Sequence, residues 1–203
     1  SATVTASDGT NSSTQDITVT VTNVNDNSPA FTSDAAFSVV ENQTGIGTIT
    51  ATDDDGDTLS FSLSGTDASS MSINSSSGVL VFNSAPDYET KTSYSATVTA
   101  SDGTNSTTQD ITITITDIDD TAPVFTSSAS FSAAENQTSI GTVTATDVDT
   151  DNASITFSIS GSELSITSGG VLTFASTPDY ETKSSYSATV TASDGTNSST
   201  QDI

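Results

Sequence analysis

The stretch "SATVTASDGTNSTTQDITITIT", residues 95–116, is the strongest structural signal in this chain. Apolar and polar residues alternate with a period of two in both of its halves, as Ile111, Ile113 and Ile115 illustrate. This period is typical of a β-strand with one buried face. The "DGTN" between the two halves has the Asp, Gly and Asn residues that tight turns favour. The stretch therefore predicts a β-hairpin.

The first twelve residues of this hairpin recur without change along the chain, beginning at Ser1, Ser95 and Ser187. The offsets are 94 and 92 residues, and the shorter motifs "ENQT" and "PDYETK" recur with the same period. A fixed period of this length indicates a tandem array of small domains.

Each period predicts an all-β domain. Besides the hairpin, the alternation predicts strands at residues 36–40, 47–52, 59–64, 71–73 and 79–82, which makes seven short strands, and no helical period is present. Seven strands separated by turns favour tandem seven-stranded Greek-key immunoglobulin-like sandwiches. The large apolar residues expected in the core are Phe37, Phe61, Phe82 and Tyr94.

The repeats predict three segments. Residues 1–28 match the last hairpin and linker of a preceding, truncated repeat; residues 29–120 form a complete repeat; residues 121–203 form a repeat that lacks its last strand. The chain is thus expected to be a window on a longer tandem array. An alternative is strand exchange, in which a neighbouring chain supplies the missing strand.

The composition narrows the possible partners. With 26 acidic and 2 basic side chains the net charge is −24, which excludes nucleic acid as a partner. No apolar run approaches the roughly 18 residues that span a bilayer, so direct membrane insertion is not expected. The chain has no Cys and no His, which excludes disulfides and argues against zinc or haem. Carboxylate and amide oxygens remain, and these suit calcium or magnesium.

The acidic residues gather at strand ends and turns. In the complete repeat they are Glu41, Asp53, Asp54, Asp55, Asp57, Asp87, Glu89 and Asp102. Stacking two repeats end to end would add Asp147, Asp149 and Asp194 of the next repeat and the linker residues Asp117, Asp119 and Asp120. So many close carboxylates must splay apart, protonate or bind cations. Calcium accepts about 6 to 8 oxygens in irregular geometry, whereas magnesium requires a stricter octahedron. The sequence therefore favours calcium over a merely solvated acidic surface.

These residues fall into motifs that resemble the calcium-binding motifs of cadherin repeats. The linker motif is present as "NVNDNSP" at residues 23–29 and "DIDDTAP" at residues 117–123. The other motifs are "VEN" and "AEN" (residues 40–42 and 134–136), "DYE" (87–89 and 179–181), "DDD" and "DVD" (53–55 and 147–149), and "ASD" ending at Asp8, Asp102 and Asp194. The resemblance covers the whole chain, although Asn23 and Thr121 depart from the linker pattern.

The resemblance implies a ligand set for calcium at each junction. At the main junction, a pair of ions would bind Glu41, Asp87, Glu89 and Asp120, with Asp117 in the same linker and Asp149 bridging toward the next repeat. A further ion would bind Asp119, Asp147 and Asp194, helped by backbone oxygens at Ile118, at Thr121 and near Asn152. The first junction would keep an incomplete set of Asn25, Asp26, Asn27, Asp53, Asp55, Asp57 and Asp102. Glu135, Asp179 and Glu181 would form the far end.

The leading functional hypothesis is a calcium-dependent adhesive spacer on a cell surface or in a secreted protein, in which calcium at the repeat junctions rigidifies the array. Its expected partners are calcium ions, neighbouring repeats or identical chains, and surface proteins or glycans. One alternative is an extracellular filament subunit joined head to tail by calcium or strand exchange; another is a carbohydrate- or protein-binding β-sandwich module. No nucleophile, base and orienting group occur together, so no enzyme activity is expected. The Ser/Thr-rich, Cys-free composition favours a microbial surface adhesin.

Overall fold

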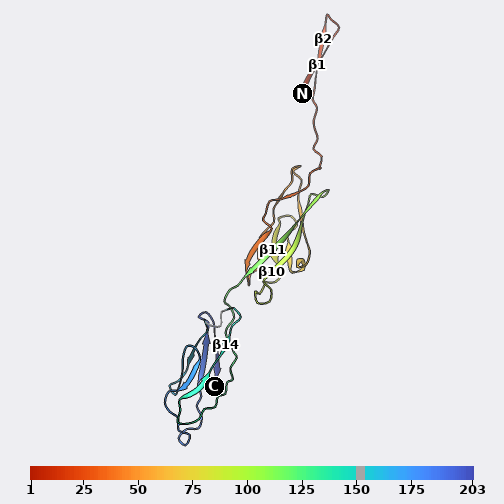
Figure 1. Ribbon diagram of the computed structural model, residues 1–203. Helices are drawn as coiled ribbons and strands as arrows, with labels where there is room; N and C mark the ends of the chain where they lie inside the picture. Colours follow the sequence, from red (N-terminus) through yellow and green to blue (C-terminus); the bar gives the residue numbers. More distant parts are fainter. Residues whose placement is uncertain (150–153) are drawn as a thin grey trace. The chain divides into compact units, whose positions relative to one another are not determined.

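The computed structural model describes residues 1–149 and 154–203. Its strands are joined by turns and loops, and they include the short 3-10 helix η1 (Ala68–Ser70) (Figure 1). The chain divides into two compact units, one made of residues 1–37, 44–84 and 94–113 and the other of residues 38–43, 85–93 and 114–203. None of the described helical residues forms a segment long and apolar enough to cross a membrane.

The N-terminal segment forms a hairpin. Strands β1 (Ala2–Ser7) and β2 (Ser12–Ile17) pair antiparallel, with Ala2 opposite Ile17 and Ser7 opposite Ser12. The turn is closed by Asp8, whose Oδ1 accepts hydrogen bonds from the backbone N–H groups of Thr10 (2.8 Å) and Asn11 (2.7 Å). This is the turn chemistry that the "DGTN" motif predicts.

Residues 30–116 contain the predicted strands of the complete repeat. They are β3 (Ala30–Phe31), β4 (Ala36–Val40), β5 (Gly45–Thr48), β6 (Ala51–Thr52), β7 (Ser60–Ser64), β8 (Met71–Ile73), β9 (Val79–Phe82), β10 (Ser93–Ser101) and β11 (Ser106–Thr116). They form a four-stranded sheet in the order β4-β11-β10-β7, a three-stranded sheet in the order β5-β9-β8, and the pair β3-β6. The all-β fold is therefore confirmed.

The predicted strand at residues 47–52 is wrong as one element, because the chain changes pairing partner within it. β5 pairs with β9, whereas β6 pairs with β3. Between them, the backbone N–H of Ile49 donates to the carbonyl of Gly78 (2.9 Å), and the carbonyl of Thr50 accepts the N–H of Thr32 (2.8 Å). β3 was not predicted, since two residues are too short to show a period of two.

The core of this repeat consists of the inward faces of the strands. Leu80, Val98, Ile111 and Ile113 are at most 1% exposed. Of the predicted aromatic core, Phe61 and Phe82 are buried, whereas Phe37 and Tyr94 are half-buried. The ring of Tyr94 meets that of Phe82 edge to face, with a 4.9 Å centroid distance.

The second repeat has the same pattern of pairing except at the counterpart of β4. Its strands are β12 (Val124–Phe125), β13 (Ser139–Thr142), β14 (Ala145–Thr146), β15 (Thr156–Ile159), β16 (Leu164–Ile166), β17 (Val171–Phe174), β18 (Thr189–Ser193) and β19 (Ser198–Asp202). The sheets are β13-β17-β16, β15-β18-β19 and the pair β12-β14, and the core cluster contains Val143, Leu164, Leu172 and Val190. No strand is assigned at residues 130–134, the counterpart of β4.

Two equivalent glycines close the turns that precede β9 and β17. Gly78 and Gly170 have φ values of 70° and 86°, in the left-handed region that glycine tolerates best. A Cβ at either position would also collide with a backbone carbonyl oxygen, that of Ile49 or Val143. Both positions therefore require glycine, and the shared constraint shows that the two sandwiches are built in the same way.

Candidate metal centre

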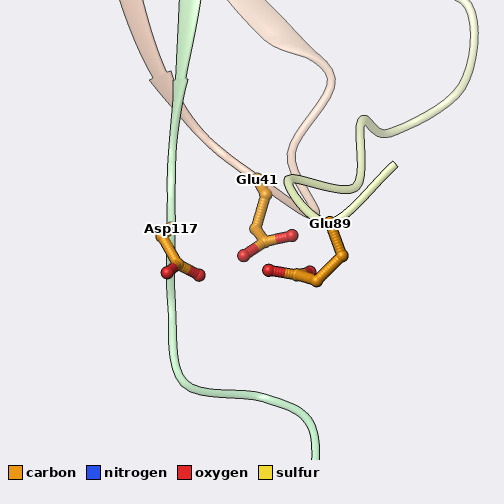
Figure 2. A group of neighbouring side chains, drawn as sticks. All are labelled: Glu41, Glu89 and Asp117. Atoms are coloured by element: carbon orange, nitrogen blue, oxygen red, sulfur yellow. The ribbon is translucent and has the colours of Figure 1, made fainter. Parts of the chain in front are cut away.

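Five carboxylates from separate parts of the chain meet in the second compact unit. The carboxylate oxygens of Glu41, Glu89 and Asp117 lie within 4.8 Å of one another, and so do those of Glu89, Asp120 and Asp149. Figure 2 shows the side chains of Glu41 and Glu89 directed toward each other, with Asp117 on the segment that follows β11. The two groups share Glu89, so they form one continuous acidic site, called here the main site.

Glu41 is the buried anchor of the main site. It follows β4 directly and is only 2% exposed. Its Oε2 accepts the backbone N–H of Tyr88 (2.8 Å), and its Oε1 accepts that of Ile118 (2.9 Å). One carboxylate thus fixes both the loop that carries Glu89 and the segment that carries Asp117. Each of its oxygens keeps a second lone pair for another partner.

Asp149 holds the linker from the side of the next repeat. Its Oδ2 accepts the backbone N–H groups of Asp120 (3.0 Å) and Thr121 (2.6 Å). Its Oδ1 is buried and has no hydrogen-bond partner within residues 1–149 and 154–203. A buried oxygen without a partner is costly, so this atom is an acceptor in need of a cation or donor.

Asn42 was not predicted as a site residue, yet it also contacts the linker. Its Nδ2 donates to Oδ2 of Asp120 at 2.6 Å. Its φ of 62° is left-handed, which asparagine adopts more readily than most residues. The recurrence of "ENQT" was the available signal, but only the glutamate of that motif was interpreted.

Crowding changes the proton affinity of these carboxylates. Desolvation, followed by the hydrogen bond to Asp149 and the negative charge of Glu41, raises the pKa of Glu89 to about 7. Desolvation and the charges of Asp149 and Glu41 also raise the pKa of Asp117. Burial opposes ionisation of Asp149, but the N–H groups of Thr121 and Asp120 outweigh it and lower that pKa. Without a cation, the main site therefore retains a proton on Glu89 near neutral pH.

Because of this proton, the stability of the folded chain in a chelating buffer should depend on pH. The pKa of Glu89 rises from 4.5 to about 7 on folding, so the folded state holds an extra proton between these values. Its contribution to stability is present below pH 4.5 and is lost as the pH rises through about 7. We expect the midpoint of urea denaturation to fall as the pH rises across this window. In the variant Glu89→Gln the midpoint should depend less steeply on pH. Glu163→Gln, outside the main site, serves as control; an unchanged slope in Glu89→Gln would contradict this origin.

Asp87 lies outside the two carboxylate groups of the main site. Its Oδ1 and Oδ2 accept the N–H (3.2 Å) and the Oγ1 hydroxyl (3.0 Å) of Thr90, and thus cap the turn that carries Glu89. For Ile118 and Thr121, the structure shows hydrogen bonds from their N–H groups, and their carbonyl oxygens as ligands stay a prediction.

Two members of the predicted third set, Asp119 and Asp194, are linked through an asparagine. Asp119, Asp147 and Asp194 are not among the described carboxylate groups within 4.8 Å of one another. Instead, Nδ2 of Asn197 donates to the carbonyl (3.1 Å) and Oδ1 (3.2 Å) of Asp119, while Oδ1 of Asp194 accepts the N–H of Asn197 (2.7 Å). Oδ1 of Asp147 accepts the N–H of Asp149 (3.0 Å). Asn152 lies outside the described residues.

The first linker has the same construction around Asp55. Its Oδ2 accepts the N–H groups of Asp26 (3.0 Å) and Asn27 (2.8 Å), as Asp149 does for the second linker. The bond from Asn27 is the main cause that lowers the pKa of Asp55. Nδ2 of Asn105 donates to Oδ1 of Asn25 and to the carbonyl of Asn27, both at 2.9 Å.

The remaining predicted ligands fall near this linker and at the far end of the second repeat. Carboxylate oxygens of Asp53, Asp55 and Asp57 lie within 4.8 Å of one another, and Asp102 caps its own turn by accepting N–H groups of Thr104 and Asn105. At the far end, Glu135, Asp179 and Glu181 form an exposed group in which Glu135 accepts the N–H of Tyr180 (3.1 Å).

The comparisons with known proteins agree with this construction. A family model described as "Cadherin domain" matches residues 35–116 and 128–202, more than half of the chain. Mouse protocadherin Fat 4 is 36% identical over 203 residues, which cover 91% of this chain and 4% of that protein. Human protocadherin gamma-A10 is 36% identical over 216 residues, which cover 95% of this chain and 23% of that protein. The chain therefore spans a small part of the length of these relatives.

The fold comparison gives the same answer. The crystal structure of the protocadherin gamma B4 extracellular domain matches with a TM-score of 0.71 and 25% identity, and the match covers 95% of this chain and 33% of that one. Cadherin domains bind calcium in general, and the family is in general not enzymatic. The microbial origin rests on composition alone and stays a prediction. The shared motifs, sandwiches and relatives lead to one assignment: the chain belongs to the cadherin domain family.

Proposed function

We propose that this chain is a calcium-dependent structural and adhesive spacer, part of a tandem array that lies outside the cell on its surface or in a secreted protein. The observation that carries the proposal is the main site, in which carboxylates that follow β4, β11 and β14 converge on one linker. In an array of repeats, ions bound there would fix the linker and both of its neighbours, and so stiffen the junction.

The geometry supports two adjacent calcium positions. One would be bound by Glu41, Glu89 and Asp117, and the other by Glu89, Asp120 and Asp149. Glu89 would bridge the two ions, and the buried Oδ1 of Asp149 would gain the partner that it lacks among the described residues. Calcium tolerates such irregular sets of oxygens and can share carboxylates between ions. Two dications would nearly neutralise five carboxylates, which removes the repulsion.

We assign the other predicted ligands to further calcium positions, whose ligand sets are less complete. Asp119, Asp147 and Asp194 would form a third position, because Asn197 already joins Asp119 to the turn of Asp194. Asp87 would support the loop of Glu89, and carbonyl oxygens at Ile118 and Thr121 would complete coordination. Asn25, Asp26, Asn27, Asp53, Asp55, Asp57 and Asp102 would serve the first linker, and Glu135, Asp179 and Glu181 the far end.

In this proposal residues 1–28 are the last hairpin and linker of a preceding repeat, residues 29–120 a complete repeat, and residues 121–203 a repeat without its last strand. The partners are calcium, neighbouring repeats and identical chains. Extracellular calcium modules have dissociation constants on the order of 10⁻⁴ to 10⁻³ M. Such sites fill outside cells and stay empty in cytosol. Calcium that binds only the folded junction also stabilises it by mass action. No enzyme activity is proposed for this chain.

The test combines calorimetry with small-angle scattering. Calcium should bind the wild-type chain and narrow the distribution of its interatomic distances relative to chelator. Asp149→Asn should weaken binding at the main site by roughly tenfold or more, because a ligand charge is lost. Asp55→Asn is the matched control, since it changes the equivalent residue of the first linker and should spare the main site. Equal scattering in calcium and in chelator would refute the proposal.

A further inference from the structure

The chain contains seven Asn-X-Ser/Thr sequons, the acceptor sequence for N-linked oligosaccharides in secreted proteins. They begin at Asn11, Asn42, Asn74, Asn105, Asn136, Asn152 and Asn197. Asn11 and Asn136 repeat the motifs of Asn105 and Asn42, and Asn152 lies outside the described residues. An oligosaccharide is attached to the side-chain Nδ2, so a usable sequon needs an exposed amide whose nitrogen has no structural role.

Three of the sequons have a side-chain amide that a linker uses. Nδ2 of Asn42 donates to a carboxylate oxygen of Asp120. Nδ2 of Asn105 and of Asn197 each donate to a backbone carbonyl of the linker that precedes their own repeat. A sugar on any of these nitrogens would occupy the space of the linker. We call these three residues the linker asparagines.

Asn74 differs from the linker asparagines because its amide is exposed and its nitrogen is accessible. It directly follows β8 and begins the exposed loop 74–77. Its Oδ1 accepts the backbone N–H groups of Ser76 (3.1 Å) and Ser77 (2.9 Å) and the hydroxyl of Ser76 (3.0 Å). Within residues 1–149 and 154–203, its Nδ2 has no hydrogen-bond partner. The turn therefore fixes the amide by its oxygen and leaves the nitrogen to solvent.

The strand beside Asn74 is a sheet edge that lacks the charge found at its counterpart. β8 is the outer strand of the sheet β5-β9-β8, as β16 is in the sheet β13-β17-β16. Glu163 directly precedes β16 and pairs with Lys183 (2.6 Å), whereas residues 68–86, which include β8, contain no charged side chain. Edge strands without charge tend to pair with other chains. Thr167 replaces Asn74 in the second repeat, so this sequon occurs only where the edge is uncharged.

We propose that Asn74 is the acceptor of an N-linked oligosaccharide, which shields the edge of β8 from pairing with another chain. The donor is a lipid-pyrophosphate-linked oligosaccharide, and a membrane-bound transferase catalyses the transfer. A bond forms between Nδ2 and the anomeric carbon of the sugar, and the bond from that carbon to the pyrophosphate oxygen breaks. The lipid pyrophosphate leaves, and Nδ2 loses one proton to solvent. The proposal rests on the proposed function only for the location outside the cell.

The test is secretion of the 203-residue chain from cultured animal cells, behind a cleavable signal peptide. Enzymatic release of the sugar in heavy-oxygen water converts each modified Asn to a labelled Asp, so peptide mass spectrometry gives the occupancy of every sequon. Asn74 should be modified in most chains, and the linker asparagines in a minor fraction. Ser76→Ala destroys the sequon and should remove the sugar from Asn74. Ser75→Ala is the matched control, because it keeps the sequon and should keep the sugar.

Ser76→Ala also removes the hydroxyl that bonds to Asn74, so a second variant separates the turn from the sequon. Ser76→Thr keeps both a hydroxyl and the sequon, and it should stay modified. Three results would overturn the assignment. They are an unmodified Asn74 in the secreted wild-type chain, a sugar that survives Ser76→Ala, and linker asparagines that are occupied as fully as Asn74.

Sedimentation over a range of concentrations tests the shielding role. The unmodified Ser76→Ala chain should associate as its concentration rises, whereas the modified wild-type and Ser75→Ala chains should stay monomeric. Adding Ser72→Lys, which places a charge on β8 itself, should return the Ser76→Ala chain to the monomer. Equal association of modified and unmodified chains would refute shielding. Failure of calcium to bind would leave the occupancy of Asn74 unchanged, so failure of the proposed function is distinguishable from failure of this proposal.

Discussion

Replacing Glu41 by glutamine is expected to weaken calcium binding at the main site by at least roughly tenfold and to destabilise the calcium-bound chain. Glu41 is itself buried, and both of its carboxylate oxygens accept part-buried backbone N–H groups, from Tyr88 and Ile118. Glutamine offers one acceptor oxygen, so its amide NH₂ would face one of these donors. A buried donor left unpaired costs about 1–3 kcal/mol.

Comparison of calcium with chelator separates the two roles of Glu41. In chelator, loss of one negative charge also relieves repulsion with Asp117, which partly offsets the lost hydrogen bond. With calcium bound that repulsion is already neutralised, so the loss of stability should be larger. The matched control is Glu135→Gln, because Glu135 occupies the same motif but is exposed. Equal loss from both variants in urea denaturation and calorimetry would contradict this role.

Replacing Ile113 by alanine is expected to lower the free energy of unfolding of the first sandwich by roughly 2–5 kcal/mol. The side chain is fully buried, so alanine would remove apolar contacts and leave a cavity. Val19 occupies the corresponding position of the N-terminal segment but is 79% exposed. Val19→Ala should therefore change stability by less than about 0.5 kcal/mol in dilute monomer. Thermal and urea denaturation measure both changes. Similar losses of stability in the two variants would contradict the claim that burial of the side chain determines the loss.

The strands were predictable where the alternation is long. The hairpins and β4, β8 and β9 follow from a period of two, because each strand buries one face. The change of pairing partner at Ile49 could not be predicted. The same alternation continues there while the hydrogen bonds pass from one sheet to another. A local pattern records which face is buried and does not record which strand lies alongside.

The acidic residues of the site were predictable, but the amides that hold them were not. Repeated motifs and charge indicate Glu41, Glu89 and Asp149 directly, because clustered carboxylate oxygens are the ligands that calcium prefers. Asn105 and Asn197 each donate to a linker about eighty positions away in the sequence. In the sequence they are ordinary turn residues, so only the folded register reveals this contact.

The bonds from each linker to Asp55 or Asp149 have a consequence for how such arrays grow. Each linker is hydrogen-bonded to an aspartate of the repeat that follows it, before any cation is considered. A gene duplication that copied a sandwich together with its upstream linker would also copy the aspartate to which that linker is hydrogen-bonded. A breakpoint between the linker and that aspartate would separate two halves of one structure. The heritable building block is therefore better described as residues 23–116 than as a sandwich followed by its own tail.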